Sequence, residues 1–367
     1  MTKRSSPWLV ASLSLLGACS DEAVDVDRNA VLRDLADNVL IPTCARYGTS
    51  ARALATALDA LCASPTAGLL GQARDQWWAT RLAWKEAQVF QAGPFEALRM
   101  QATVDWYLVD ASAVEATIEG GDPLTVDSVA SLGANRRGLP GLEVVLFDGA
   151  IADEALVARL RGGASPTRRC QYLVAVGEQV ARTSEAFVAA WQPDGGAYGR
   201  TLATAGQGST IATTREAVDL VVNQLSNTLE TLEVTRLSIP EGSRSGGTPQ
   251  PDRVESSRSN ASVAEVAAGL RGVRAIYLGT YGARSGLGLT SMVAARSPSL
   301  DRSVRAELDA CEASLRAITL PLQRAVLEQR PSVDAAVTEL GRLKRLLRVD
   351  VANLLGVTIS FNSNDGD

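Results

Sequence analysis

The first chemical fact about this sequence is that its 367 residues include no histidine. A Ser-His-Asp triad, a Cys-His pair and a His-Glu-x-x-His zinc site therefore cannot form, and the side chain that usually moves protons near pH 7 is missing. The sequence also lacks the Ser-x-x-Lys, Gly-x-Ser-x-Gly and Cys-x-x-Cys motifs. Hydrolytic chemistry would have to rely on carboxylates, lysine or an imported metal.

Arg81 lies four residues after Trp77 and three before Trp84. A helix would place its guanidinium beside both indoles, where it either stacks on them or holds a carboxylate such as Glu143. Ordinary packing and ion pairing are the alternative. Four tryptophans of this region are candidates to line a pocket for haem or a sugar, although aromatic residues at helical spacing usually belong to the core: Trp77, Trp78, Trp84 and Trp106.

The N-terminus has the pattern of a bacterial lipoprotein signal. Two basic residues, Lys3 and Arg4, precede an apolar run over residues 8–16, and Leu-Gly-Ala-Cys then ends at Cys19. We expect residues 1–19 to be the signal and Cys19 to be lipidated, with an ordinary cleaved signal as the alternative. The apolar run is shorter than the about 20 residues that a membrane-spanning helix needs.

Residue 20 is serine rather than aspartate, which under the usual bacterial sorting preference favours the outer membrane, with the protein facing the periplasm. The first expected partner is therefore a membrane, reached through the lipid anchor. The net charge is −5 and lysine occurs at only three positions, so the sequence predicts no basic surface that could bind the phosphate backbone of a nucleic acid. Nucleic acid is not an expected partner.

Four cysteines follow Cys19, and an even number in an oxidising compartment suits two disulfides. Sequence leaves three pairings open. Cys44 and Cys62 flank an expected turn at residues 48–50, so we favour this pair, which leaves Cys170 with Cys311. Buried free thiols are the alternative.

Apolar residues recur at helical spacing nearly throughout the chain, and few segments alternate as strands do, so the sequence predicts an all-α fold. Several of the predicted helices exceed 20 residues, which suits a bundle. The predicted helical segments are 29–46, 68–91, 168–191, 209–237, 258–280, 300–328 and 332–354.

Residues 239–258 are rich in glycine, serine, proline and charge, which predicts a mobile surface loop. Long helices on both sides indicate that this loop joins helices of one bundle. We therefore expect the domain boundary earlier, near residue 165, which gives an N-terminal bundle over 28–165 and a C-terminal bundle over 166–367.

Three motifs, in order along residues 28–367, resemble the imelysin family. Arg81-x-x-Trp84 is followed by Gly-Pro at 93–94, and residues 137–143 read Arg-Gly-Leu-Pro-Gly-Leu-Glu before Val-Val-Leu-Phe. Leu-Gly-Val at 355–357 then precedes a family-like C-terminus over 361–367. The resemblance implies a fold of two packed helical bundles, a location in the cell envelope and a link to iron uptake in several members.

The resemblance also implies a metallopeptidase motif, Gly-x-His-x-x-Glu, which falls on Gly138, Pro140 and Glu143. Proline stands where the motif has histidine, and its side chain cannot ligate a metal. A lone Glu143 could join a carboxylate-rich iron site but cannot rebuild a histidine-based zinc site.

Glu143, Asp105 and Arg81 are therefore the candidate ligand-binding or metal-binding residues. Glu143 follows a Gly-Leu-Pro helix entry, so an N-terminal helix carboxylate that interacts with the helix dipole is the alternative role. The family resemblance makes Asp105, just before Trp-Tyr, a second site acid, and a polar contact between helices is its alternative role.

The sequence thus predicts an exported lipoprotein that binds a ligand without catalysis and is connected with iron or metal uptake. It assigns no catalytic residue, and it leaves the cofactor open, with iron or another divalent metal as the candidate. The ligand would be a metal or a metal chelate, and a membrane transport protein would be a further partner. Two alternatives stay open: a metallopeptidase with a carboxylate-based metal site, and a structural or interaction lipoprotein with a degenerate site.

Overall fold

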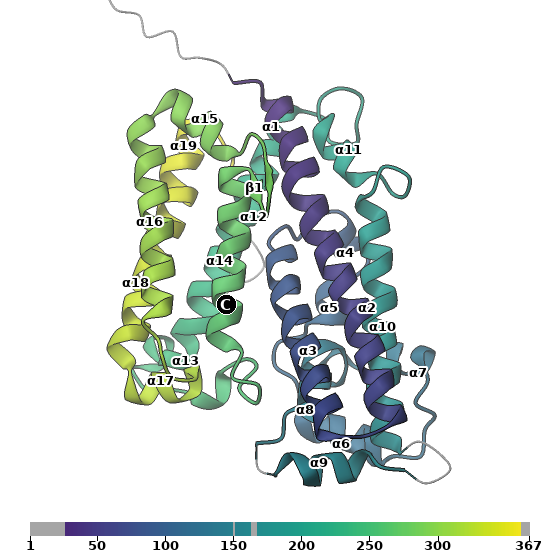
Figure 1. Ribbon diagram of the computed structural model, residues 1–367. Helices are drawn as coiled ribbons and strands as arrows, with labels where there is room; N and C mark the ends of the chain where they lie inside the picture. The colour runs from purple at the N-terminus through teal and green to yellow at the C-terminus, as the bar shows by residue number, and fades with distance from the viewer. Residues whose placement is uncertain (1–25, 150, 163–166, 361–367) are drawn as a thin grey trace, which may run out of the picture.

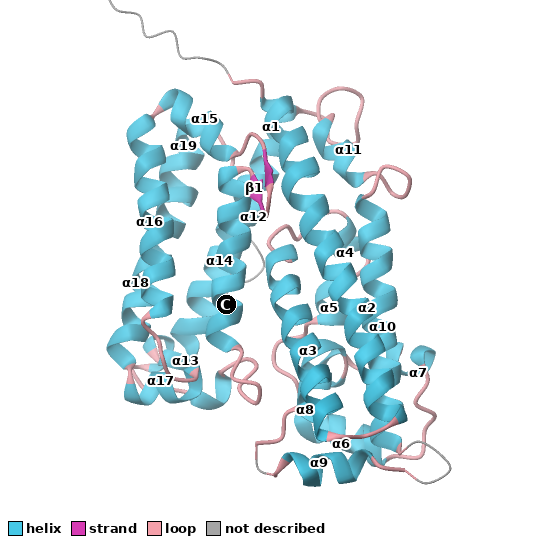
Figure 2. Cartoon of the chain, in the orientation of Figure 1, coloured by secondary structure: helices cyan, strands magenta, loops and turns pink. Residues whose placement is uncertain are grey.

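The chain was analysed as a computed structural model that describes residues 26–149, 151–162 and 167–360. Within these residues the one sheet is a small hairpin, in which β1 (Thr280–Tyr281) pairs antiparallel with β2 (Arg284–Ser285). Nearly all other regular structure is helical, and two helical bundles stand side by side (Figures 1 and 2). The predicted all-α fold of two packed bundles is confirmed.

The predicted lipoprotein signal with Cys19 and the family-like C-terminus over 361–367 lie outside the described residues. Among the helices that the structure does describe, none combines the length and the apolar character needed to cross a membrane.

Three long helical segments build the first bundle. α1 (Arg28–Leu35), a π-helical turn η1 (Ala36–Leu40) and α2 (Ile41–Ala63) form one continuous rod, and α3 (Ala67–Ala87) and α10 (Arg168–Trp191) pack against it. Thr66 and Thr167 cap α3 and α10, since each side chain accepts a hydrogen bond from a backbone N–H three residues ahead. Trp77 and Trp84 of α3 are buried in the core, as their helical spacing predicts, whereas Trp78 is half-buried.

Short helices connect α3 to α10 and close the bundle. They are α4 (Pro94–Ala97), α5 (Met100–Val104), α6 (Ala111–Glu119), α7 (Val126–Ala130), η2 (Ala134–Arg136), α8 (Gly138–Leu146) and α9 (Asp153–Leu160), and α11 (Tyr198–Ala203) follows α10.

The second bundle holds the remaining helices. α12 (Thr214–Glu230) continues through the π-helical segment η3 (Thr231–Ser238) into α13 (Ile239–Glu241), and α14 (Ser262–Leu278) packs beside them. The others are η4 (Ser243–Ser245), η5 (Pro251–Arg253), α15 (Leu289–Arg296), α16 (Pro298–Arg316), α17 (Leu322–Glu328), α18 (Arg330–Arg345), η6 (Leu346–Val351) and α19 (Ala352–Leu355).

The division between the bundles falls later than the expected residue 165, because α10 belongs to the first bundle. Gly177 of α10 lies so close to α2 that a Cβ there would be 2.6 Å from Leu58 Cδ1. Arg52 of α2 also forms ion pairs with Glu178 and Glu185 of α10. The chain therefore passes to the second bundle only after α11.

Residues 239–258 are packed rather than forming the free surface loop expected from their composition. Three short helical turns fall within them, and the side chains of Glu241 and Glu255 are buried. Tyr107 donates a hydrogen bond to the carbonyl oxygen of Arg253 at 2.7 Å, and Arg330 forms an ion pair with Glu241. Tertiary contacts thus hold a segment whose own sequence lacks helical periodicity.

The expected disulfide pairing is wrong. Cys44 and Cys62 lie on the same helix, α2, where 18 residues at 1.5 Å per residue separate them by about 27 Å, far beyond disulfide reach. The expected turn at 48–50 is absent because Gly48 serves close packing: a Cβ there would be 2.7 Å from Val188 Cγ2 of α10. Cys170 and Cys311 lie in different bundles, and all four cysteines of the described residues are free.

The two bundles meet where α3 faces α14 (Figure 1). Gly272 of α14 permits this approach, since a Cβ there would be 2.6 Å from Val89 Cγ2 and 2.7 Å from the carbonyl oxygen of Glu86. Arg271 crosses the same contact and reaches Glu86 Oε1 at 2.9 Å. The contact therefore brings charged side chains of α3 against those of the second bundle.

Candidate functional site

Six charged side chains meet at the contact between the bundles, and we call them the charge cluster. α3 supplies two cations, the chain after α5 supplies an aspartate, and the second bundle supplies three residues from η3, the segment after η5, and α14. They are Arg81, Lys85, Asp105, Arg236, Glu255 and Glu265. Three cations face three carboxylates, so the cluster has no net formal charge.

Arg81 is the centre of the charge cluster, and its side chain is 0% exposed. Its Nε lies 2.8 Å from Glu265 Oε1, its Nη2 lies 2.8 Å from Glu255 Oε1, and its Nη1 donates to Asp105. One guanidinium therefore holds three carboxylates from three separate segments, a geometry that suits its fixed fork of N–H donors.

Lys85, one helical turn after Arg81, binds the same carboxylates. Its Nζ lies 2.8 Å from Asp105 Oδ2 and 3.2 Å from Glu255 Oε1. Trp84 Nε1 also donates to Asp105 Oδ2 at 2.7 Å. Burial alone would raise the pKa of Asp105, but the positive charges of Arg81 and Lys85 hold that pKa well below its usual range.

Glu143 sits beside the charge cluster rather than in it. Its Oε1 accepts hydrogen bonds from the backbone N–H and the hydroxyl of Ser259, both at 2.8 Å. Glu143 lies in the middle of α8 and binds the second bundle instead of capping its own helix. Burial raises its pKa to about 7, against the lowering effect of the Ser259 hydrogen bonds.

The backbone around Gly138 places Glu143. Gly138 has a φ of +72°, and a Cβ there would overlap the carbonyl oxygen of Val104. Gly141 faces the hydroxyl of Tyr172 just as closely, and Pro140 is buried between these two glycines. The two glycines of the Gly-Leu-Pro-Gly sequence thus allow the start of α8 to pack closely against α5 and α10.

The raised pKa of Glu143 gives a pH-dependent prediction. The folded chain keeps this proton between pH 4.5 and about 7, whereas the unfolded chain releases it, so the stabilisation is present below pH 4.5 and is lost as the pH rises through about 7. Glu143→Gln cannot ionise, so its free energy of unfolding relative to the parent should rise by up to about 3 kcal/mol from pH 4.5 to pH 8. Urea unfolding at both pH values measures this difference.

Glu328→Gln is the matched control, because Glu328 is exposed and a hydrogen bond from Arg324 lowers its pKa. This variant should gain no stability relative to the parent on raising the pH. Parallel pH profiles for Glu143→Gln and the parent would contradict the account of Glu143.

A polar cavity of about 460 Å³ opens beside the charge cluster, with Asp105 and Arg236 in its wall. Phe95 and Trp106 are the large apolar side chains of this wall, of which Phe95 is buried and Trp106 is 43% exposed. The guanidinium of Arg236 lies over the Tyr107 ring at 4.5 Å. Amides and hydroxyls make up most of the remaining wall: Gln88, Gln91, Gln101, Gln224, Asn227, Thr231 and Thr235.

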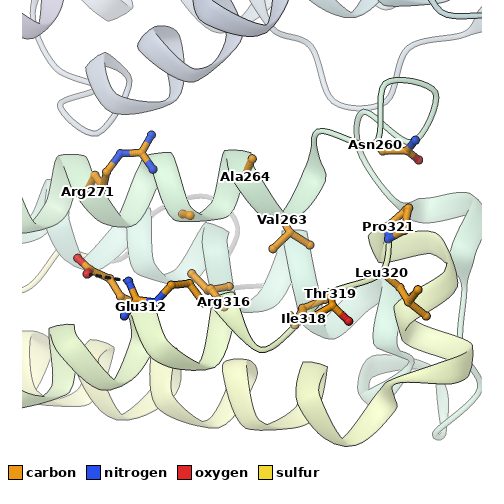
Figure 3. Close-up of a pocket in the computed structure, with 12 residues that line it drawn as sticks. Asn260, Val263, Ala264, Arg271, Glu312, Arg316, Ile318, Thr319, Leu320 and Pro321 are labelled. Carbon is orange, nitrogen blue, oxygen red and sulfur yellow. Dashed lines mark ion pairs between the residues drawn. The ribbon is translucent and has the colours of Figure 1, made fainter.

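A second, larger groove of about 620 Å³ lies between α14 and α16 (Figure 3). Its wall is mainly apolar, from residues such as Val263, Leu315 and Ile318, and Glu312 and Arg316 pair along one side. No residue of the charge cluster lines this groove. We therefore place the candidate site at the polar cavity.

The residues present do not fit the metal centre that the Gly-x-His-x-x-Glu motif implies. Pro140 has no donor atom, and Glu143 Oε1 is already engaged by Ser259. Throughout residues 26–149, 151–162 and 167–360, no three Asp, Glu or Cys side chains converge as metal ligands would. Arg81 and Lys85 occupy the position between the carboxylates that a cation would take.

The structure brings two of the three sequence-predicted residues, Arg81 and Asp105, into direct contact and places Glu143 nearby. Sequence reasoning missed the other members of the site: Lys85, Arg236, Glu255, Ser259 and Glu265. Lys85 could have been predicted from the sequence, because it is one of only three lysines and lies four residues after Arg81 on the same helix face. The others come from the second bundle and have no local signal.

Comparison with known proteins identifies relatives of this chain. The profile of a family described as imelysin, under a peptidase family name, matches residues 40–349. Iron-regulated protein A of Synechococcus elongatus is 23% identical over 269 residues, which cover 72% of this chain and 68% of the relative.

Two solved structures have the same fold. A putative iron-regulated protein A precursor from Parabacteroides distasonis superposes with a TM-score of 0.78 at 20% identity, over 89% of this chain and 95% of that one. An imelysin-like protein from Psychrobacter arcticum gives a TM-score of 0.73 at 18% identity, over 92% of this chain and 99% of that one.

Proposed function

This chain belongs to the imelysin family, and from that membership we propose that it is a non-catalytic binding protein connected with iron uptake, whose ligand occupies the polar cavity. The observation that carries the proposal is the wall of that cavity, where amides and hydroxyls surround an exposed tryptophan beside a neutral charge cluster. The name of the cyanobacterial relative supports the connection with iron.

The cavity wall favours an oxygen-rich solute over a bare cation. Side-chain amides both donate and accept hydrogen bonds. The charged side chains of the wall are Arg236, Glu96 and Asp105, and Asp105 is already paired with Arg81 and Lys85. Trp106 offers an apolar face against which a flat ligand can pack. A hydroxycarboxylate chelate of iron has this chemistry, because its carboxylate and hydroxyl oxygens remain available while the metal is already ligated.

The charge cluster supports binding rather than catalysis. Every carboxylate in it forms ion pairs with cations of the same cluster, so none is left as a free base or as an open metal ligand. Glu143 and Ser259 are 3% and 7% exposed, so a substrate would have to part the bundles to reach them. The ion pairs of the charge cluster instead hold Asp105 and Arg236 in fixed positions in the cavity wall.

The proposal places the protein at the outer membrane, facing the periplasm, through a lipid on Cys19, where a membrane transport protein would receive the ligand. The motif at residues 16–19 supports the lipid on Cys19, and serine at position 20 supports the outer membrane. Cell fractionation of the parent and a Cys19→Ser variant tests it, and a variant that stays on membranes as the parent does would contradict the anchor.

Titration with ferric citrate tests the function. The parent should bind it stoichiometrically, with iron counted by elemental analysis after gel filtration and affinity measured by calorimetry. Asn227→Leu and Trp106→Ala change the cavity wall, and each should weaken binding about tenfold or more, since a lost contact of about 1.4 kcal/mol has that effect. Arg316→Gln, in the groove between α14 and α16, is the control and should bind as the parent does.

Two outcomes would contradict the proposal. In one, the parent binds neither ferric citrate nor citrate, and in the other, the cavity variants bind as tightly as the parent does. Bare ferrous, ferric and zinc ions are titrated in parallel against Glu143→Gln. Stoichiometric binding of a bare ion that this variant loses would support the metallopeptidase alternative instead.

A further inference from the structure

We propose that Cys62 and Cys170 form a redox-active dithiol that closes to a disulfide between α2 and α10. The register of these two helices carries the inference. They pack antiparallel, because Gly48 meets Val188 and, further along α2, Leu58 meets Gly177. The same register brings Cys62, near the end of α2, to Cys170, near the start of α10.

The two cysteines are in direct contact. Cys62 Sγ lies 3.7 Å from the carbonyl oxygen of Cys170 and donates to it. The thiols also interact with each other, and this contact lowers the pKa of Cys170 while it raises that of Cys62. Cys170 is the third residue of α10, and its Sγ also lies 3.5 Å from the carbonyl oxygen of Leu160.

An opening in the surface gives reagents access to the pair. A mainly apolar cavity of about 500 Å³ is lined by both Cys62 and Cys170, together with Leu124, Val126 and Val174. Cys62 is the partly exposed member of the pair, and Cys170 behind it is buried. The remaining cysteines, Cys44 and Cys311, are also buried and belong to other parts of the fold.

The oxidant is a small disulfide such as oxidised glutathione. Cys62, the partly exposed thiol, loses its proton and attacks one of its sulfurs, which forms a mixed disulfide and releases one glutathione thiolate. The Cys170 thiolate then attacks the Cys62 sulfur, which forms the Cys62–Cys170 bond and releases the second glutathione thiolate. The protein loses two protons and two electrons, and the oxidant becomes two thiols.

The disulfide would join positions 108 residues apart and so restrict the unfolded chain strongly. We therefore expect oxidation to raise the Tm of the chain by roughly 5 °C or more. Reduction should reverse this shift.

The experiment uses the full chain with Cys19→Ser, incubated with oxidised glutathione and then treated with a maleimide under denaturing conditions. Peptide mapping should recover one cross-linked peptide pair, Cys62 with Cys170, while Cys44 and Cys311 carry maleimide. The double variant Cys44→Ala/Cys311→Ala should give the same cross-link. Cys62→Ser and Cys170→Ser should each lose it, together with the Tm difference between oxidised and reduced protein.

Four maleimide-labelled cysteines after oxidation would overturn the inference, as would any other pairing or a glutathione adduct that never resolves to the cross-link. Cys62→Ser changes a partly exposed side chain at a helix end, so it remains informative if the variant at buried Cys170 fails to fold.

Discussion

Arg81→Met is expected to lower the free energy of unfolding by about 3–5 kcal/mol or more, the range found when one partner of a buried ion pair is removed. The variant leaves Asp105, Glu255 and Glu265 buried without their central cation, so that only Lys85 and Arg236 remain to neutralise three carboxylates. Methionine fills a similar volume, so the loss reports charge rather than a cavity. Urea unfolding monitored by circular dichroism measures it.

Arg52→Met is the matched control, because Arg52 also pairs with two carboxylates but is 42% exposed. Its loss should stay below about 1 kcal/mol. Adding Glu265→Gln to Arg81→Met should recover part of the lost stability, because one unpaired carboxylate becomes neutral. Equal losses for Arg81→Met and Arg52→Met would mean that the charge cluster does not hold the bundles together.

Gly138→Ala is expected to cost about 3 kcal/mol or more, since a left-handed backbone disfavours alanine by about 1–2 kcal/mol and the steric overlap adds to that. The new Cβ would overlap the carbonyl oxygen of Val104, a backbone atom that cannot rotate away. Relief requires α8 to move, which would pull Glu143 from Ser259. The free energy of unfolding and the pH profile of stability should therefore change together.

Gly71→Ala provides the control within the first bundle. Gly71 lies inside α3, and a Cβ there would meet nothing within 4 Å. Alanine should stabilise the helix by about 0.5–1 kcal/mol. A neutral Gly138→Ala would show that α8 can shift freely, and the fixed placement of Glu143 would then have to be abandoned.

Hydrophobic periodicity predicted the long helices well. The segment expected at 168–191 is α10 itself, and the segment expected at 68–91 contains all but the first residue of α3. The segment expected at 300–328 is broken by a turn between α16 and α17. Gly48 was misread as a turn signal, because close packing of two helices and a tight turn both require glycine and only the tertiary structure separates them.

The sequence also pointed to part of the site. Arg81 and Asp105 were predicted, and the structure joins them in one cluster. Glu255 was hidden in a segment whose composition resembles a free loop, and Glu265 sits on a helix with no feature that marks a site. The disulfide pairing failed for a related reason: Cys62 and Cys170 become neighbours only through the antiparallel packing of α2 and α10.

By itself the sequence determined the all-α class, the family and the absence of histidine chemistry, because periodicity, motifs and composition are local properties that a chain carries before it folds. Only the tertiary structure decided which charges neutralise one another, where the bundles divide and which thiols meet. Those are contacts between residues far apart in the sequence, such as Arg81 and Glu265, which are 184 positions apart. Their formation depends on how helices pack, and no short stretch of sequence records it.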